Sequence, residues 1–145
     1  MKKTIVVIVT LSLCFSCIRE YESRTNYLFI NDTKAKIELV AKRTDSSHSY
    51  VIDSSTVIET KAKVEFYYVE DGDNQVSRHP FGYTVPEVNI VFNDSLILHY
   101  SHDDINPRNI LQIENFEGGN VRTGIFEFSY TFTEEDFNNA VPINE

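Results

Sequence analysis

The chain has 145 residues, and its 22 Asp and Glu outnumber its 13 Lys and Arg, so its formal net charge is −9 at pH 7. Such an acidic surface repels phosphate backbones and anionic lipid headgroups, which argues against nucleic-acid binding and against membrane contact through a basic face. The length suits one domain with one hydrophobic core, for which ten Phe and eight Tyr supply large side chains.

The first residues have the layout of an export signal. Lys2 and Lys3 precede an uncharged, apolar run from Ile5 to Phe15. A short positive segment followed by such a run is typical of a secretory signal peptide. The run is too short to cross a bilayer comfortably as a helix, which takes about 20 apolar residues. We therefore expect this segment to direct export.

The two cysteines of the chain, Cys14 and Cys17, end this segment in the stretch LSLCFSCIRE. A zinc site needs further ligands at matching spacing, and a redox C-x-x-C pair lies near a βαβ pattern; the sequence shows neither. The Ser16–Cys17 junction resembles a bacterial lipobox, although Cys14 stands where that motif usually has Leu. The resemblance implies that residues 1–16 are removed as a signal peptide and that Cys17 becomes the acylated N-terminus.

A lipid on Cys17 has physical consequences for the mature chain. No second cysteine remains after processing, so we expect no disulfide and no cysteine metal ligand. Two acyl chains are generally enough to anchor a protein stably, so membrane contact is expected through this lipid. Residues 17–26 are predicted to form a lipidated tether, and residues 27–145 a single domain.

From residue 26 onward, apolar and polar residues alternate with a period of two, which predicts strands. The stretch NYLFINDTKAKIELVA is predicted to form a hairpin with its turn at Asn31–Lys34, which places Leu28 and Ile30 on the core face with Ala35, Ile37 and Leu39. SYVIDS is predicted to be a short strand. In TKAKVEFYYVE the alternation predicts a strand that buries four side chains: Ala62, Val64, Phe66 and Tyr68.

The stretch PEVNIVFNDSLILHYS is predicted to form a second hairpin. A three-residue loop, Asn93–Ser95, brings the apolar residues of both strands to one face, whereas a two-residue loop would set Phe92 opposite Ser95. Register follows the hydrophobic face. The predicted pairs are therefore Phe92 with Leu96, Ile90 with Leu98, and Val88 with Tyr100.

The last part of the chain completes the predicted fold. RNILQIENF is predicted to form one or two short strands before a Gly118–Gly119 turn, and GIFEFSYTFT the closing strand. Thr133 is a suitable N-cap for a short helix, with Asp136 as its capping-box partner. About seven or eight short strands predict an all-β fold, an antiparallel β-sandwich of immunoglobulin-like or transthyretin-like outline with a short C-terminal helix. A small closed barrel is the alternative.

The order of these elements after the lipobox resembles the small β-rich lipoproteins of Bacteroides-like Gram-negative bacteria. The hairpins NYLFINDTKAKIEL and VNIVFNDSLILHYS and the closing YTFTEEDFNNA carry the likeness. It implies a lipid-anchored place on the outer membrane, facing either the periplasm or the exterior, and it implies no catalytic residue. The stretch DSL also resembles the three-residue O-glycosylation signal of these bacteria, which makes Ser95 a candidate for modification.

No catalytic, cofactor or metal site is predicted. The stretch EDGDN lacks the alternating ligands and the distant Glu of a calcium loop. His99 and His102 lie three residues apart, so on an extended strand their side chains point to opposite faces. Carboxylate pairs are too common in this acidic chain for one to be singled out as an acid and base.

The connection EDGDNQVSRHPFGYTVP (70–86) is the predicted partner-binding loop. It is longer than most connections in compact domains. It gathers Arg78, His79, Phe81 and Tyr83, and aromatic and Arg side chains are the types that anchor interfaces. The competing interpretation is that Phe81 packs under the sandwich as part of a lid.

These observations predict a non-catalytic binding or structural role in the cell envelope, with a protein or glycan partner. One alternative is an envelope or glycan hydrolase that uses paired carboxylates. Another is an immunity or inhibitor protein that plugs another protein's site with an acidic loop.

Overall fold

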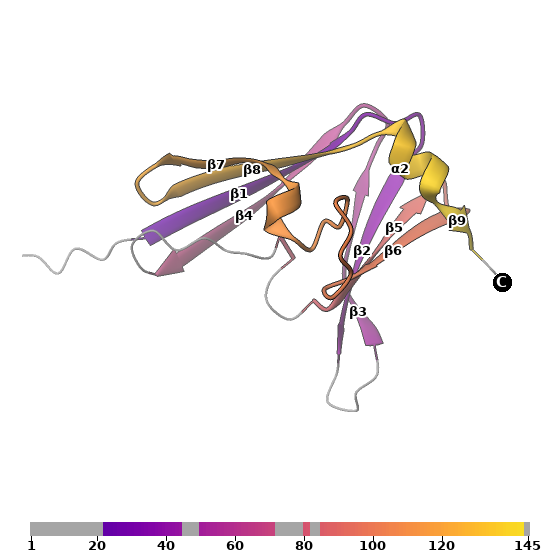
Figure 1. The fold of residues 1–145 in the computed structure, drawn as a ribbon, viewed down its shortest axis with the longest axis horizontal. Helices are drawn as coiled ribbons and strands as arrows, with labels where there is room; N and C mark the ends of the chain where they lie inside the picture. The colour runs from indigo at the N-terminus through magenta and orange to yellow at the C-terminus, as the bar shows by residue number, and fades with distance from the viewer. Residues whose placement is uncertain (1–21, 45–49, 72–79, 82–84, 144–145) are drawn as a thin grey trace, which may run out of the picture.

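The computed structural model describes residues 22–44, 50–71, 80–81 and 85–143, and of residues 44, 50–53 and 71 only the backbone is described. Within these ranges the chain forms two β-sheets and one short α-helix near the C-terminal end (Figure 1). Buried side chains from both sheets make one hydrophobic core. The predicted all-β sandwich with a short C-terminal helix is therefore confirmed.

The first sheet has the strand order β4-β1-β8-β7, and the second has the order β3-β2-β5-β6-β9. Neighbouring strands run antiparallel except for β1 and β8, which are parallel. That one pair departs from the predicted antiparallel pairing. The elements are β1 (Glu22–Asn31), β2 (Ile37–Thr44), β3 (Tyr50–Ile58), β4 (Lys63–Asp71), β5 (Glu87–Phe92), β6 (Leu96–Ser101), the 3-10 helix η2 (Ile113–Asn115), β7 (Glu117–Arg122), β8 (Ile125–Phe132), α2 (Glu134–Asn139) and β9 (Val141–Pro142).

The predicted hairpin of β1 and β2 is wrong, because the two strands belong to different sheets. β1 lies between β4 and β8, and its core-facing aromatic residues are Tyr27 and Phe29, which are fully buried. Leu28 and Ile30 lie on the opposite face. The structure also extends β1 back to Glu22, so residues 22–26, which were assigned to the tether, belong to the domain.

Asn31 directs the chain from one sheet to the other. Its side-chain amide donates to the carbonyl oxygens of Ala35 (2.8 Å) and Ile58 (3.1 Å), and its Oδ1 accepts from the backbone N–H (3.0 Å) and hydroxyl (2.7 Å) of Thr33. Both side chains are buried. Because a buried amide without partners is costly, these contacts fix the corner between β1 and β2 and oppose a flat hairpin turn.

The predicted pairing of β5 with β6 and the predicted alternation of side chains in β4 are both confirmed in full. In the β5–β6 hairpin, Phe92 lies opposite Leu96, Ile90 opposite Leu98 and Val88 opposite Tyr100. In β4 the side chains of Val64, Phe66 and Tyr68 pack against the core, as does Ala62 just before the strand, and the intervening residues are exposed. Both features depend on neighbours in the sequence, which is why the pattern revealed them.

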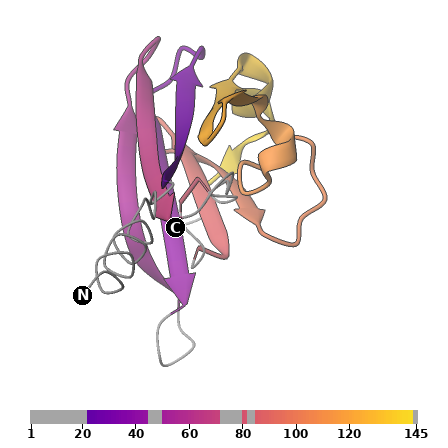
Figure 2. The ribbon, with the colours of Figure 1, turned by 90° about the vertical axis from the view of Figure 1, so that its left-hand side faces the viewer.

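The connection between β6 and β7 differs from its prediction. Residues 108–116 form turns and η2 instead of strands, and Gly118 and Gly119 lie within β7 instead of forming a turn. In this connection Ile110 and Leu111 are buried in the core. Figure 2 shows the connection standing out from the side of the two sheets.

The centre of the core is aromatic. The ring of Phe29 lies 5.5 Å from that of Phe66 and 5.6 Å from that of Phe116, both in edge-to-face geometry, and it stacks on Phe81 at 5.6 Å. Such pairs add to the free energy gained from burial. Among the described residues, no helix is long and apolar enough to span a membrane.

Candidate functional site

The residues between β6 and η2 form a loop with a polar centre of its own, which we call the Asn109 loop (residues 102–112). Asn109 is fully buried. Its side-chain amide donates to the carbonyl oxygens of Ser101 (2.8 Å) and Asp104 (3.0 Å), and its Oδ1 accepts from the backbone N–H of Leu111 (2.9 Å). One side chain therefore provides the hydrogen bonds that a strand partner would provide elsewhere.

Further side chains secure the same loop. The carboxylate of Asp104 accepts from the backbone N–H of Ser101 (2.7 Å), and Gln112 donates to the carbonyl oxygen of Asp104 (3.0 Å). Asn115 donates to the carbonyl oxygens of Asn106 and Asn109, each at 2.9 Å. The loop is therefore held in one conformation by contacts from both of its ends.

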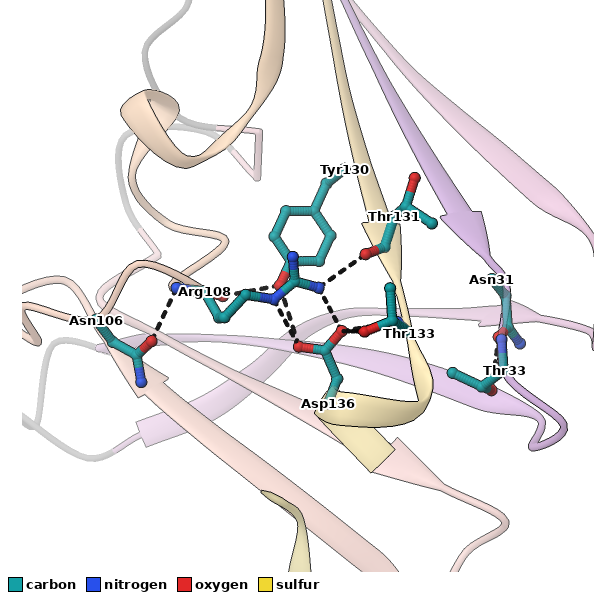
Figure 3. A network of polar contacts seen from close by, with 8 residues as sticks. All are labelled: Asn31, Thr33, Asn106, Arg108, Tyr130, Thr131, Thr133 and Asp136. Carbon is teal, nitrogen blue, oxygen red and sulfur yellow. Dashed lines mark hydrogen bonds and ion pairs between the residues drawn. The ribbon is translucent and has the colours of Figure 1, made fainter. Parts of the chain in front are cut away.

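An ion pair and a hydrogen bond fasten the base of the Asn109 loop to α2 and β8 (Figure 3). Arg108 donates to the carboxylate of Asp136 through Nε (2.9 Å) and through Nη2, and it also donates to the carbonyl oxygen of Thr131 (2.8 Å). Its guanidinium carbon lies 4.4 Å from the ring centre of Tyr130. Asp136 is only 2% exposed, and the pairing offsets the free-energy cost of burying its carboxylate.

Asp136 is also the predicted capping-box residue of α2. Its Oδ2 accepts from the backbone N–H of Thr133 at 2.8 Å, and the capping box of the helix is present as predicted. The prediction gave Asp136 one partner, whereas the structure gives it a second role as the acceptor for Arg108. Nothing in the local pattern indicates the second partner, because Arg108 lies far away in the sequence.

Two tyrosines near this ion pair, Tyr100 and Tyr130, have raised pKa values. Burial raises the pKa of Tyr130, and the negative charge of Asp136 raises it further. The same causes, burial first, raise the pKa of Tyr100 to about 12. Both phenols therefore remain neutral at physiological pH, which suits packing and hydrogen bonding better than acid–base chemistry at neutral pH.

The tip of the Asn109 loop displays one apolar side chain to solvent. Ile105 is 99% exposed. The side chains beside it are acidic and also exposed at Asp103 and Asp104, and His102 lies 3.9 Å from the carboxylate of Asp103. The loop thus presents an aliphatic side chain with carboxylates on its N-terminal side.

A second feature is an open groove on the first sheet, with a volume of about 660 Å³. We call it the sheet groove. Its lining side chains come from the central strand β1 and the pair β7–β8, and the cross-strand register places Asn26, Glu127 and Gly119 in one row and Leu28, Ser129 and Glu117 in the next. The lining residues are Asn26, Leu28, Glu117, Gly118, Gly119, Asn120, Val121, Glu127, Phe128 and Ser129.

The sheet groove has acidic side chains and no basic side chain among its lining residues. Glu117 and Glu127 are exposed carboxylates, and Oδ1 of Asn26 is buried without a hydrogen-bond partner among the described residues. The groove was not predicted from the sequence, because it depends on the register of β8 with β1, which is distant in the sequence. The glycine pair beside Glu117 was the available signal, and it was interpreted as a turn.

The residues predicted for the 70–86 loop are only partly described. The ring of Phe81 stacks on Phe29 and contacts Phe66 edge-on at 5.5 Å, and the hydroxyl of Tyr68 donates to the carbonyl oxygen of Pro80 (2.6 Å). Phe81 therefore packs into the core, as the lid interpretation has it. The other three candidates lie outside the described residues, so their binding role stays a prediction: Arg78, His79 and Tyr83.

The remaining candidate residues from the sequence are Cys17, Ser95 and the histidines. Cys17 lies outside the described residues, and Ser95 is exposed in the turn between β5 and β6, where its modification stays a prediction. Nδ1 of His99 lies 2.9 Å from Oδ1 of Asn89. No cluster of His, Cys, Asp or Glu in the described part of the chain is arranged to hold a metal ion.

Comparison of the chain with protein-family models, with curated proteins and with solved structures found no match.

Proposed function

We propose that the protein is a lipid-anchored, non-catalytic binding protein of the cell envelope that docks onto a partner protein through the Asn109 loop. The observation that carries the proposal is the fully exposed Ile105 at the tip of a loop fixed by buried side-chain amides. A lipid on Cys17, on the outer membrane, would hold this loop near its partner.

The energetics favour such a contact. Complete burial of one Ile side chain is worth about 1.5–3 kcal/mol, and binding loses less entropy when the loop is already ordered. Asp103 and Asp104 are exposed next to Ile105. The complementary partner surface is therefore an apolar socket bordered on one side by Lys or Arg, which would pair with these carboxylates.

This arrangement supports the inhibitor interpretation more specifically than a purely structural role. An inhibitor needs a protruding, preorganised segment over a well-packed core. The Asn109 loop buries Ile110 and Leu111 in the core, and the connection that contains it stands out from the side of the two sheets (Figure 2). The hydrolase alternative has the exposed pair Glu117 and Glu127 in its favour. However, a carboxyl that serves as general acid in such a pair is usually kept protonated by an apolar site.

The proposal is tested by placing a photoreactive amino acid at position 105 of the full-length protein in its native envelope. Irradiation should cross-link one protein, and the modified peptide should come from an apolar surface that also carries Lys or Arg. In a second arm, the partner identified by cross-linking is purified by itself. It should bind the wild-type protein, and Ile105→Asp should weaken that binding at least tenfold.

The matched control is Val57, an apolar residue that is 50% exposed on β3. A photoreactive group at position 57 should not capture the same protein, and Val57→Asp should bind like wild type. Cross-linking of position 105 to lipid alone, to no molecule, or to the same protein as position 57 would overturn the proposal.

A further inference from the structure

The outer edge of β4 is an unprotected sheet edge (Figure 1). The edge strands are β4 and β7 in the first sheet and β3 and β9 in the second. β7 contains two glycines with positive φ and a register shift, the pairing of β3 contains a register shift, and β9 is two residues long and includes Pro142. Such devices keep a sheet edge from pairing with another chain. β4 has none of them, because its nine residues pair with β1 in unbroken register and include neither glycine nor proline.

The free edge of β4 presents backbone hydrogen-bonding groups at every second residue. The N–H of Asn31 donates to the carbonyl oxygen of Ala62, just before β4. Bonded and non-bonded residues alternate along an antiparallel pair, so the even-numbered residues of β4 bond to β1 and the odd-numbered ones point their N–H and C=O groups away from it. The odd-numbered residues are Lys63, Glu65, Tyr67 and Val69. Within the part of the chain that the structure describes, no backbone group outside the first sheet bonds to them.

The side chains at this edge leave apolar surface uncovered on both faces of the sheet. On the outer face, Tyr67 is 58% exposed and Val69 is 51% exposed. On the core face, Val64, Phe66 and Tyr68 are only partly buried, whereas the core-facing residues of the neighbouring strand β1 are almost completely buried. A further strand beside β4 would cover these side chains on both faces.

We infer that β4 pairs with β4 of a second copy of this chain, so that the two first sheets join into one. The two strands would run antiparallel about a two-fold axis at Tyr67, which sets this residue opposite its own equivalent and Phe66 opposite Tyr68. The odd-numbered residues of the two strands then bond to one another, as their outward N–H and C=O groups require. The same edge serves both copies, as in most symmetric dimers. This pairing does not depend on the docking role of the Asn109 loop.

The charges of β4 favour this register over its neighbours. The axis at Tyr67 sets Lys63 opposite Asp71 of the second copy. It sets Glu65 opposite Val69, so no like charges face each other. A shift of the pairing by two residues either removes the Lys63–Asp71 pair or sets Glu65 opposite Asp71. Cross-strand pairs of opposite charge stabilise a sheet and like charges destabilise it, so the sequence of β4 is complementary to itself.

The test is disulfide cross-linking of the full-length protein in the cells that produce it. Tyr67→Cys is treated with the oxidant copper phenanthroline, and dimers are separated by non-reducing electrophoresis. Residues of a bonded antiparallel pair lie about 5.5 Å apart at Cα, within the range of about 4.4–6.8 Å that a disulfide spans. Tyr67→Cys should therefore give at least tenfold more linked dimer than the wild type, whose own cysteines set the background.

The matched control is Glu65→Cys, at a position exposed on the same face of the same strand. In the inferred dimer residue 65 lies opposite residue 69, so the two copies of residue 65 are offset by about 13 Å along the strand. Glu65→Cys should therefore not exceed the background. Equal linking by Glu65→Cys and Tyr67→Cys would indicate random collision and overturn the inference.

A proline tests whether the backbone makes the contact. Val69→Pro, added to Tyr67→Cys, removes an N–H that points at the second copy and no bond to β1. It should reduce the linked dimer to background while the near-ultraviolet circular dichroism spectrum of the purified protein is retained. Linking that survives Val69→Pro, linking of Tyr67→Cys to a different protein, or no linked dimer would also overturn the inference.

Discussion

At the scale of single residues, buried polar groups decide the shape of this domain as much as its apolar residues do. Asn31, Asn109 and Asp136 are almost completely inaccessible, and each bonds to segments that are distant in the sequence or irregular in structure. An unpaired buried polar group costs about 1–3 kcal/mol. Each of these side chains therefore selects one path for the chain and penalises the others.

The buried phenol of Tyr100 predicts how stability changes at high pH. Its pKa is about 12 in the folded state and about 10 in an unfolded chain. Between these values the unfolded state releases a proton that the folded state keeps, so the free energy of unfolding falls as pH rises from about 10 to about 12. Below pH 10 this contribution is fully present.

Urea unfolding at pH 8 and pH 11 should therefore show a smaller loss of stability for Tyr100→Phe than for wild type. Phenylalanine keeps the ring and removes the titrating hydroxyl, and other groups that titrate in this range are common to both proteins. Equal losses in the two proteins would contradict the prediction.

At the scale of elements, local patterns were reliable and long-range partners were not. The β5–β6 hairpin is right in every pair because its register depends on residues on either side of one short loop. The pairing of β1 failed because its neighbours β4 and β8 lie far along the chain. Residues 108–116 were predicted as one or two short strands, and their apolar Ile110 and Leu111 are indeed buried. The sequence pattern does not reveal that side-chain amides, instead of a neighbouring strand, bond to the backbone there.

The glycine pair in β7 gives a prediction at this scale. A Cβ atom at Gly118 would lie 2.1 Å from the carbonyl oxygen of Glu127, and the residue has φ of +117°. Gly118→Ala should therefore force β7 away from β8 and lower the free energy of unfolding by about 2 kcal/mol or more, since both strain and a steric clash contribute.

Gly119→Ala serves as the comparison. Gly119 also has positive φ, +150°, but a Cβ atom there meets no neighbour, so the substitution should cost only the backbone strain. Chemical denaturation of both variants measures the difference. A Gly119→Ala variant that is less stable than Gly118→Ala would show that the β7–β8 contact is not as tight as the structure has it.

At the scale of the whole molecule, the predicted anchor lies close to the domain in the sequence. Only residues 18–21 separate Cys17 from the start of β1 at Glu22. An extended chain rises at most about 3.6 Å per residue, so Cys17 lies within about 18 Å of the first strand. If the lipid proposal is right, the domain stays close to the membrane surface, and a partner must approach it there.

The lipid itself is tested by mass spectrometry of the intact protein from membranes. The wild type should begin at Cys17 and carry acyl chains, whereas Cys17→Ser should accumulate as the unprocessed, unacylated precursor. Cys14→Ser should be processed like wild type, because Cys14 is predicted to leave with the signal peptide. A mature N-terminus beyond Cys17 without lipid would contradict the prediction.

The position of β1 inside the first sheet also determines how the domain would bear a mechanical load. If the lipid proposal is right, a pull on the anchor enters the fold at Glu22, and its component along β1 acts on that whole strand. That strand is bonded to β4 on one side and to β8 on the other along most of its length. A force along the strand therefore shears both ladders at once, so their hydrogen bonds share the load and do not open one after another as at a sheet edge. The first strand is thus placed where its extraction is resisted from both sides, as the proposed lipid-anchored binding role would require.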